Sequence, residues 1–416
     1  MRVAVIGAGV VGVTTAYYLA QHGHQVSVIE QCGNVCEQAS LGHAGLLGPA
    51  HLAPLAAPGM VGQILSQWLK SDGAVNLRPS LQLNQWRWLR SWLRECNLEQ
   101  LIARKTHLQR LGSYSQQQLS VLSNVHNLDF QSRQGVLQLF RQSREQSKIT
   151  AGLAVLTDAG IPFHLLDEAA CYQQEPALNH DRELAGGLFM PGDGSGNCAL
   201  FTKQLKQLTQ QWGVEYLFST ECLSLHSTKT GISLQLTQAQ QSLSRQFDAV
   251  VIAAGADSGP LLKALGMDLR LAQFKSYSIT SGIKNPEDTP GMAIVDEAEH
   301  VAMTRMDKRL RVSGTIQFHH SKPQRDERAW QTLRNVATHW FPDAANYHTA
   351  QYTSTRHLML PGGAPILGVS AMKNVYLNMA HAENGWALAT GSGKIVADLV
   401  SGLTPEIDLE GLCVLR

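Results

Sequence analysis

The sequence lacks several features that would assign it to a simple class. No apolar stretch is long enough to span a bilayer, and no basic N-terminal region is followed by an apolar segment and a cleavage site. The formal net charge is +1 without a long basic run, so we expect no nucleic acid as a partner. We expect a cytoplasmic protein, with a peripheral position at the inner membrane as the alternative.

The cysteine pattern also excludes two kinds of site. The seven cysteines are odd in number and scattered, so they do not indicate a disulfide framework. Cys32 and Cys36 are close, but no second pair or histidine cluster completes a zinc site, and we expect no metal. A hydrophobic content of 44% in 416 residues is ordinary for a globular protein, and the length suggests two domains.

The first thirty residues predict a dinucleotide-binding βαβ unit. A strand at 3–6 leads into a turn with Gly7, Gly9 and Gly12, then a helix at 14–22 and a strand at 25–29 that ends at Glu30. The glycines permit a tight turn, close approach of a pyrophosphate and close packing of helix on strand. Glu30 stands where a carboxylate holds a ribose 2′-hydroxyl, which disfavours a 2′-phosphate and hence NADP.

The rest of the chain reads as alternating helices and strands. The apolar segment 46–69 is broken by three prolines and a glycine, which favours a buried loop over contact with a membrane surface. Helical patterns fall at 85–94, 99–122, 148–158, 200–212, 325–341 and 385–401. Strand patterns fall at 135–140, 187–190 (before a turn at 191–196), 214–218, 232–236, 242–247, 249–253, 275–281, 293–295, 300–304, 310–316 and 375–378.

Several stretches in order along the chain resemble the FAD-dependent D-amino-acid oxidase superfamily, and most closely its D-amino-acid dehydrogenase (small subunit) branch. They are AAPG (56–59), GVLQLFR (135–141), EPAL (175–178), GGLFMPGDGSGNCALFT (186–202), DAVVIAAGADS (248–258), KSYSIT (275–280), MTRMDKRLRVSG (303–314) and HAENGWALATGSGKIVADLVSG (381–402). The resemblance implies an α/β fold, with a Rossmann-type FAD-binding domain built on a parallel sheet and an α+β substrate domain with a mostly antiparallel sheet. We assign 1–85, 196–265 and 350–416 to the first domain, and 86–195 and 266–349 to the second.

The resemblance also implies a reaction. An amino acid, either a D-amino acid or a small secondary amino acid, would lose a hydride from Cα to flavin N5, and the imino acid would hydrolyse to a 2-oxo acid. This chemistry needs orientation and a carboxylate clamp more than acid–base help. The electron acceptor would be a quinone or O2.

Three residues are catalytic candidates by resemblance. Arg356 would grip the substrate carboxylate, although the family's G-x-R-P and P-D-G-x-P-x-x-G pattern has here lost its Gly, Pro and Asp and gained one inserted residue. Tyr277 matches a tyrosine that faces the substrate, and a strand tyrosine in the core is an equal alternative. His381 lies in the last strand-to-helix turn, where the family usually has Gly-His-Gly and this chain has Ala-His-Ala followed by Glu383. A negative charge there would oppose flavin reduction.

His43 has two interpretations. With Ser40 it fits the S-x-x-H spacing of relatives whose histidine is joined covalently to the flavin, and the alternative is a non-covalent contact near the ring. Ser40 would serve the pyrophosphate or its surroundings. The full set of expected cofactor-binding residues is Gly7, Gly9, Val10, Val11, Gly12, Glu30, Gln31, Ser40, His43, Ala44, Gly45, Leu46, Ala254, Gly255, Asn384, Gly385 and Trp386.

Two further functions stay open at this stage. The altered 354–363 region suggests a pathway-specific flavin amine oxidase that acts on a larger metabolite. The altered 380–384 loop suggests a catalytically weakened FAD-binding subunit that serves in a complex with a partner subunit.

Overall fold

The computed structural model describes residues 1–69, 75–77, 82–318 and 327–413. Within these residues a largely parallel sheet forms around the N-terminal strand, in the order β18-β19-β12-β1-β2-β8. Only β18 and β19 pair in the antiparallel sense. The apolar runs of β1 and β12 are buried, as in parallel sheets covered on both faces. The bounds are β1 Arg2–Ile6, β2 Gln25–Ile29, β8 Glu215–Leu217, β12 Ala249–Ile252, β18 Ile366–Val369 and β19 Val375–Met379.

Helices cover one face of this sheet and a small sheet covers the other. The helices are α1 (Val10–Gln21), α4 (Leu98–His126), α7 (Cys198–Gln211) and α10 (Gly385–Val400), whose buried side chains share one core with β1 and β2. The small antiparallel sheet is β9 (Thr220–Ser227), β10 (Ile232–Gln238) and β11 (Gln241–Phe247). Its Leu225, Leu234 and Leu236 pack against the opposite face of β1 and β12.

A second, larger sheet follows the path β17-β13-β16-β15-β14-β5-β7-β3, with β4 beside β16 and β6 beside β7. Its pairings are antiparallel except for β14 with β5 and β16 with β4. The bounds are β3 Leu46–Leu47, β4 Val75–Asn76, β5 Arg133–Phe140, β6 His164–Leu166, β7 Gly186–Ser195, β13 Ala272–Gly282, β14 Ala293–Asp296, β15 Val301–Met306, β16 Arg309–Phe318 and β17 Gln351–Met359. The fold class predicted from sequence is confirmed.

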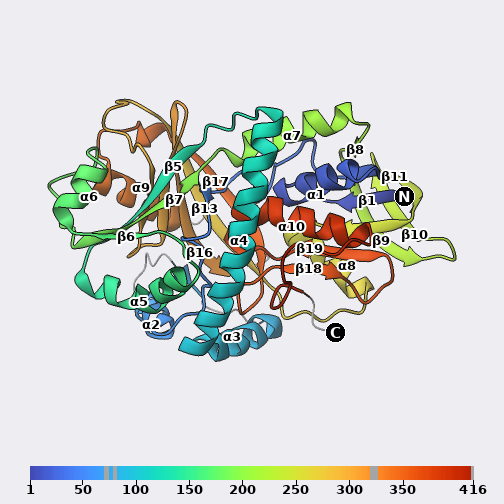
Figure 1. The fold of residues 1–416 in the computed structure, drawn as a ribbon, viewed down its shortest axis with the longest axis horizontal. Coiled ribbons are helices and arrows are strands. Elements are labelled where there is room, and N and C mark those ends of the chain that lie inside the picture. Colours follow the sequence, from blue (N-terminus) through green and yellow to red (C-terminus); the bar gives the residue numbers. More distant parts are fainter. Residues whose placement is uncertain (70–74, 78–81, 319–326, 414–416) are drawn as a thin grey trace.

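Figure 1 shows the two large sheets side by side, with α4 running across the long axis of the molecule between them. On the larger sheet, α9 (Glu327–Trp340) packs on β13, β15 and β16, and α3 (Leu83–Glu95) inserts Trp88 and Trp92 against Phe274 and Phe318. The remaining elements are α2 (Met60–Leu69), α5 (Ser143–Asp158), α6 (Glu168–Gln174), α8 (Gly259–Ala264) and the 3₁₀ helices η1 (Gly255–Ser258), η2 (Tyr347–Thr349) and η3 (Ala382–Asn384).

The structure corrects several predicted elements. The turn expected at 191–196 lies inside β7, which continues to Ser195, and β9 and β17 were not predicted. Segment 46–69 is not one loop, because it contains β3 and α2. The helix predicted at 148–158 begins at Ser143, and of the helix predicted at 325–341 the first two residues lie outside the described part. The predicted domain boundaries stay a prediction, although β17, which they assign to the first domain, is hydrogen-bonded in the larger sheet.

Candidate functional site

A cavity of about 530 Å³ opens at the carboxyl ends of β1, β2 and β12. Gly7 forms its floor with a φ of 107°, and a Cβ on Gly7 would lie 2.5 Å from the Ala253 carbonyl oxygen. Gly9 and Val10 follow at the start of α1, so the helix N-terminus faces the cavity. This is the arrangement that binds a pyrophosphate in dinucleotide sites.

Two polar side chains shape this first cavity. Each Glu30 carboxylate oxygen accepts one backbone N–H, from Ala8 at 2.7 Å and from Cys32 at 2.8 Å. Every such oxygen keeps a second lone pair, so Glu30 can still accept a ribose hydroxyl. The Ser40 hydroxyl accepts the Val10 N–H at 3.1 Å, which places it at the helix N-terminus.

Arg356 lies on the wall of the first cavity. Its guanidinium is 3.0 Å from Asp257, and Asp257 also accepts the Gln31 side-chain amide at 2.7 Å. Arg356 does not line the second cavity described below. The structure therefore places Arg356 at the first cavity and not among the residues that line the second, and its role as a carboxylate clamp stays a prediction.

The C-terminal part of the first cavity has unsatisfied polar atoms. His381 is buried, is 3.1 Å from the Ser392 hydroxyl, and has a pKa lowered by burial to about 3. Among the described residues, the Trp386 ring N–H and the Asn378 side-chain oxygen have no hydrogen-bond partner. Buried polar atoms normally have partners, so these two fit a bound polar ligand.

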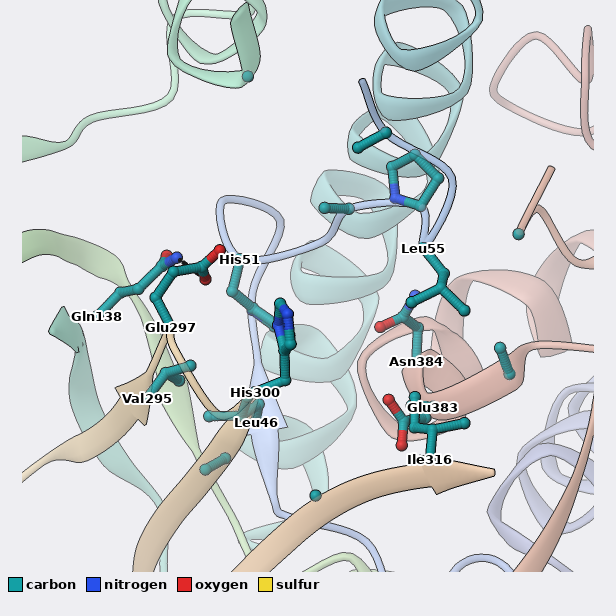
Figure 2. Close-up of a pocket in the computed structure, with 18 of the residues that line it drawn as sticks. Leu46, His51, Leu55, Gln138, Val295, Glu297, His300, Ile316, Glu383 and Asn384 are labelled. Carbon is teal, nitrogen blue, oxygen red and sulfur yellow. Dashed lines mark hydrogen bonds between the residues drawn. The ribbon is translucent and has the colours of Figure 1, made fainter. Parts of the chain in front are cut away.

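A second cavity, of about 370 Å³, lies between the larger sheet, α4, α5 and the 380–385 loop. Figure 2 shows Glu383 and Asn384 at one side of it, and Gln138 and Glu297 at the other. Glu297 accepts a hydrogen bond from the Gln138 amide at 2.5 Å, and burial raises the pKa of its carboxyl group.

The two cavities meet at three residues that line both of them, His43, His357 and Ala382. The His43 Nε2–H donates to the Glu383 carbonyl oxygen at 2.7 Å, and its Nδ1 accepts the Gly45 N–H at 2.9 Å. Burial lowers the pKa of His43 to about 3, so its imidazole is neutral. Attachment of a flavin to either ring nitrogen would break one of these two bonds, which favours the non-covalent interpretation.

His357 is held in a similar way. Its Nε2 is 2.6 Å from the Ser276 hydroxyl and 3.0 Å from the Thr355 hydroxyl, and a further hydrogen bond joins it to the Ala382 backbone. Burial lowers its pKa to about 4. Two neutral histidines therefore fix the backbone of the 382–383 segment between the cavities.

The loop at 48–52 carries His51 into the second cavity. His51 Nδ1 is 2.8 Å from Asp193, which also accepts the backbone N–H groups of Ala50 and His51. The buried Lys105 ammonium donates to the carbonyl oxygens of Ala50 and Leu52, and burial lowers its pKa to about 8. Gly48 has a φ of 113°, and its Cβ would lie 2.3 Å from the Asp193 carboxylate.

The structure distributes the sequence-predicted residues as follows. The first cavity is lined by Gly7, Gly9, Val10, Val11, Glu30, Gln31, Ser40, His43, Ala254, Gly255, His381, Gly385, Trp386 and Arg356. The second is lined by His43, Ala44, Leu46 and Asn384. Gly12 packs against the Gly7 carbonyl and Gly45 lies beside the Gly196 carbonyl, outside both linings.

Tyr277 lies in the core of the larger sheet and lines neither cavity. Its side chain is 1% exposed, its hydroxyl is bonded to Gln317, and its ring packs against Trp330. The alternative of a core tyrosine is therefore the one that the structure favours. Six further residues line the second cavity and were not predicted from the sequence: His51, Lys105, Gln138, Glu297, His300 and His357. Gln138 lies in the GVLQLFR stretch, whereas the other five belong to no motif and meet only through the fold.

Comparisons with known proteins show the family and the fold of this chain. A family model described as "FAD dependent oxidoreductase" matches residues 2–399. A D-amino acid dehydrogenase of Granulibacter bethesdensis is 34% identical over 419 residues, which cover 100% of this chain and 99% of the relative. The structure is similar to glycine oxidase from Geobacillus kaustophilus (TM-score 0.76, 20% identity, 100% and 99% of the two chains) and to iminodiacetate oxidase from Chelativorans sp. BNC1 (TM-score 0.70, 17% identity, 99% and 98%).

Proposed function

We propose that this chain, which belongs to the FAD dependent oxidoreductase family, oxidises the amine-bearing carbon of a D-amino acid or a small secondary amino acid. The product would be an imino acid that hydrolyses to a 2-oxo acid. The observation that carries the proposal is the meeting of a dinucleotide-type cavity with a second cavity at His43, His357 and Ala382. A substrate in the second cavity would face a cofactor ring at that meeting point.

The residues of the first cavity fit FAD. Glu30 would hold the ribose, the N-terminus of α1 and Ser40 would hold the pyrophosphate, and the unpartnered Trp386 N–H and Asn378 oxygen supply further polar contacts. When bound, FAD supplies an isoalloxazine ring that accepts a hydride. The chain itself fixes the geometry at the junction through His43 and His357.

The substrate carboxylate needs a cation other than Arg356. Lys105 is the buried ammonium that lines the second cavity, and it lies beside the loop that carries His51. Its side chain is buried, so solvent screens its charge less, and it attracts a carboxylate more strongly than a surface lysine does. We assign the carboxylate-attracting role to Lys105 within this proposal.

A larger amine is the second candidate substrate. The second cavity does not end at the cofactor junction. It continues to Gln138 on β5, Lys148 on α5 and Glu297 just after β14. A volume of about 370 Å³ is in the range of pockets that hold drug-sized ligands. This extent favours a substrate with a long polar side chain over glycine.

We further propose that a membrane quinone accepts the electrons and that α3 rests on the membrane. The outer face of α3 exposes Leu83 (74%), Trp86 (53%) and Leu93 (46%), interleaved with the exposed Arg87, Arg90 and Arg94. Such a mixture of apolar and basic side chains suits an anionic lipid surface. Within the described residues, the helices are too short or too polar to cross a bilayer.

Anaerobic spectroscopy of the purified protein tests the proposed reaction. The oxidised flavin band should disappear when the substrate class is added, from a panel of D-amino acids, glycine, sarcosine and both enantiomers of proline. Bleaching only by a larger amine, such as a D-amino acid with a long polar side chain, would select the second candidate. A flavin band that survives every amine in the panel would reject both.

A further inference from the structure

Glu383 presents an unpaired carboxylate to the second cavity. Figure 2 shows its side chain beside Asn384, at the side of the cavity where the cofactor junction lies. Only the backbone oxygen of Glu383 has a partner, His43, and among the described residues nothing forms a hydrogen bond or ion pair with the carboxylate. Glu383 is half-buried, and a carboxylate that loses part of its hydration without gaining a partner is complementary to a cationic ligand.

The backbone around Glu383 is held on both sides. His43 bonds the Glu383 carbonyl oxygen, His357 bonds the Ala382 backbone, and the Asn384 N–H donates to the His381 carbonyl oxygen at 2.9 Å. Both buried histidines carry pKa values lowered to about 3 and about 4, so they remain neutral and do not pair with the carboxylate. The segment thus fixes the direction of the Glu383 side chain before any ligand arrives.

The amine of an amino acid is an ammonium ion at neutral pH, and its nitrogen has no lone pair to support loss of hydride from the neighbouring carbon. One proton must leave first. Building on the function proposed above, we propose that Glu383 binds the substrate ammonium and takes one of its protons. One N–H bond breaks and one O–H bond forms, so an ammonium and a carboxylate become a free amine and a carboxylic acid, with no change in oxidation state.

The electrostatics of the site agree with this role. Burial raises the pKa of Glu383 to about 7, which suits a base that works near neutral pH. The other titratable groups that face this cavity are His43, His357, His51, His300, Lys105, Lys148 and Glu297. Once Glu383 has taken the proton it is neutral, so the negative charge that would oppose cofactor reduction is gone at the moment when hydride leaves.

Ligand-binding measurements distinguish ammonium binding by Glu383 from a purely structural role of this residue. We would titrate the holoenzyme with 2-aminoisobutyrate, which has an ammonium but no hydrogen on Cα and cannot be oxidised there, and with isobutyrate, the same skeleton without nitrogen. The pair tert-butylammonium and tert-butanol repeats the comparison without a carboxylate. Wild type should prefer each ammonium ligand, and its affinity for them should rise as the pH passes through about 7 and the carboxylate ionises.

The Glu383→Gln variant keeps the shape of the side chain and removes its charge. We expect it to lose roughly tenfold to a hundredfold in affinity for the ammonium ligands, to lose the pH step, and to bind isobutyrate and tert-butanol as wild type does. Glu297→Gln is the matched control, because it removes a buried carboxylate at the other side of the same cavity and should keep the pH step. With a turned-over substrate, Glu383→Gln should lower kcat/KM by about a hundredfold and Glu383→Asp should restore part of it.

Equal ammonium preference in wild type and Glu383→Gln would overturn the inference, as would a wild type that binds no ammonium ligand. Flavin bleaching by amino acids together with either result would keep the proposed function and remove Glu383 from it. Conversely, ammonium binding that depends on Glu383, in a protein that no amine bleaches, would reject the oxidation and keep the binding site.

Discussion

Arg356 and His357 are neighbours on β17, and only one of them lines the second cavity, where we propose that the substrate binds. Neighbouring residues of a strand point to opposite faces. Arg356 pairs with Asp257 in the first cavity, whereas His357 bonds Ser276 and Thr355 and also lines the second cavity. Without the inserted residue that we inferred from the family pattern, the position of the motif's arginine falls on His357. The clamp position of this chain is then a neutral histidine.

The first prediction concerns Arg356. Arg356→Ala should weaken FAD binding, because it removes the charge beside Asp257 in the first cavity, and should change KM for the amino acid by less than about threefold. Apoprotein titration with FAD and steady-state kinetics at saturating FAD measure the two effects separately. Asp257→Asn serves as the matched control for the same ion pair. A steep rise of KM with unchanged FAD affinity would restore Arg356 as the carboxylate clamp.

Local signals made the cofactor side of the site predictable. Gly7 and Glu30 belong to one βαβ unit, and Ser40 was predicted from its spacing to His43 in the family resemblance. The substrate side was not predictable in this way. His51, Lys105 and Glu297 come from three distant segments, and no periodicity or motif links them before the chain folds. Glu383 was visible as a departure from the family pattern, but its lack of a partner is a property of the structure.

Among the elements, the 380–385 loop has two alanines whose backbone is in the left-handed region that glycine adopts most easily. Ala380 has a φ of 61° and Ala382 a φ of 50°, in the left-handed region that side chains with a Cβ disfavour. The flanking contacts of His43 and His357 offset this cost by holding the loop.

The second prediction follows from these two alanines. Ala380→Gly and Ala382→Gly should each raise the free energy of unfolding by about 0.5 to 1 kcal/mol, because the left-handed penalty of roughly 1–2 kcal/mol exceeds the extra entropy that glycine loses. Urea unfolding of the holoenzyme measures the change. Ala397→Gly, in the interior of α10, should lower the same quantity by about 1 kcal/mol. Destabilisation by all three changes would show that these two φ values are not strained.

The turn predicted at 191–196 was wrong, because these residues continue strand β7 to Ser195. Its segment Pro-Gly-Asp-Gly reads as a turn, yet pairing with β5 resumes at Gly194 after a register shift. Bulges of this kind redirect side chains. Here the irregular part carries Asp193, whose contacts with the 50–51 backbone and His51 require it to leave the regular pleat.

At the scale of the whole molecule, α3 gives one edge of the protein a surface that is both apolar and basic. In Figure 1, α3 lies at the lower end of α4, at the edge of the molecule. The third prediction is that the protein cosediments with vesicles containing phosphatidylglycerol, and less with pure phosphatidylcholine. Replacing Arg87, Arg90 and Arg94 together by Gln should lower the partition coefficient by about two orders of magnitude, at about 1 kcal/mol per charge.

The control for this prediction is Val125→Ser, which removes an exposed apolar side chain (65%) at the opposite end of α4 and should leave vesicle binding unchanged. Added salt should weaken wild-type binding, because it screens surface charge. Equal binding to both kinds of vesicle, or none to either, would argue against α3 as a membrane-contacting face and leave O2 as the simpler electron acceptor.

The parallel sheet also sets the order of events during synthesis of the chain. The first cavity draws its walls from residues near 7, 30, 255, 357 and 386, and β1 pairs with β12 across almost 250 residues of intervening chain. A nascent chain that has emerged only as far as β12 has the glycine turn and Glu30, but neither the 380–385 loop nor Trp386. Capture of the flavin is therefore completed only when nearly all of the polypeptide has left the ribosome, and until then the half-built pocket exposes apolar strands that are prone to aggregate.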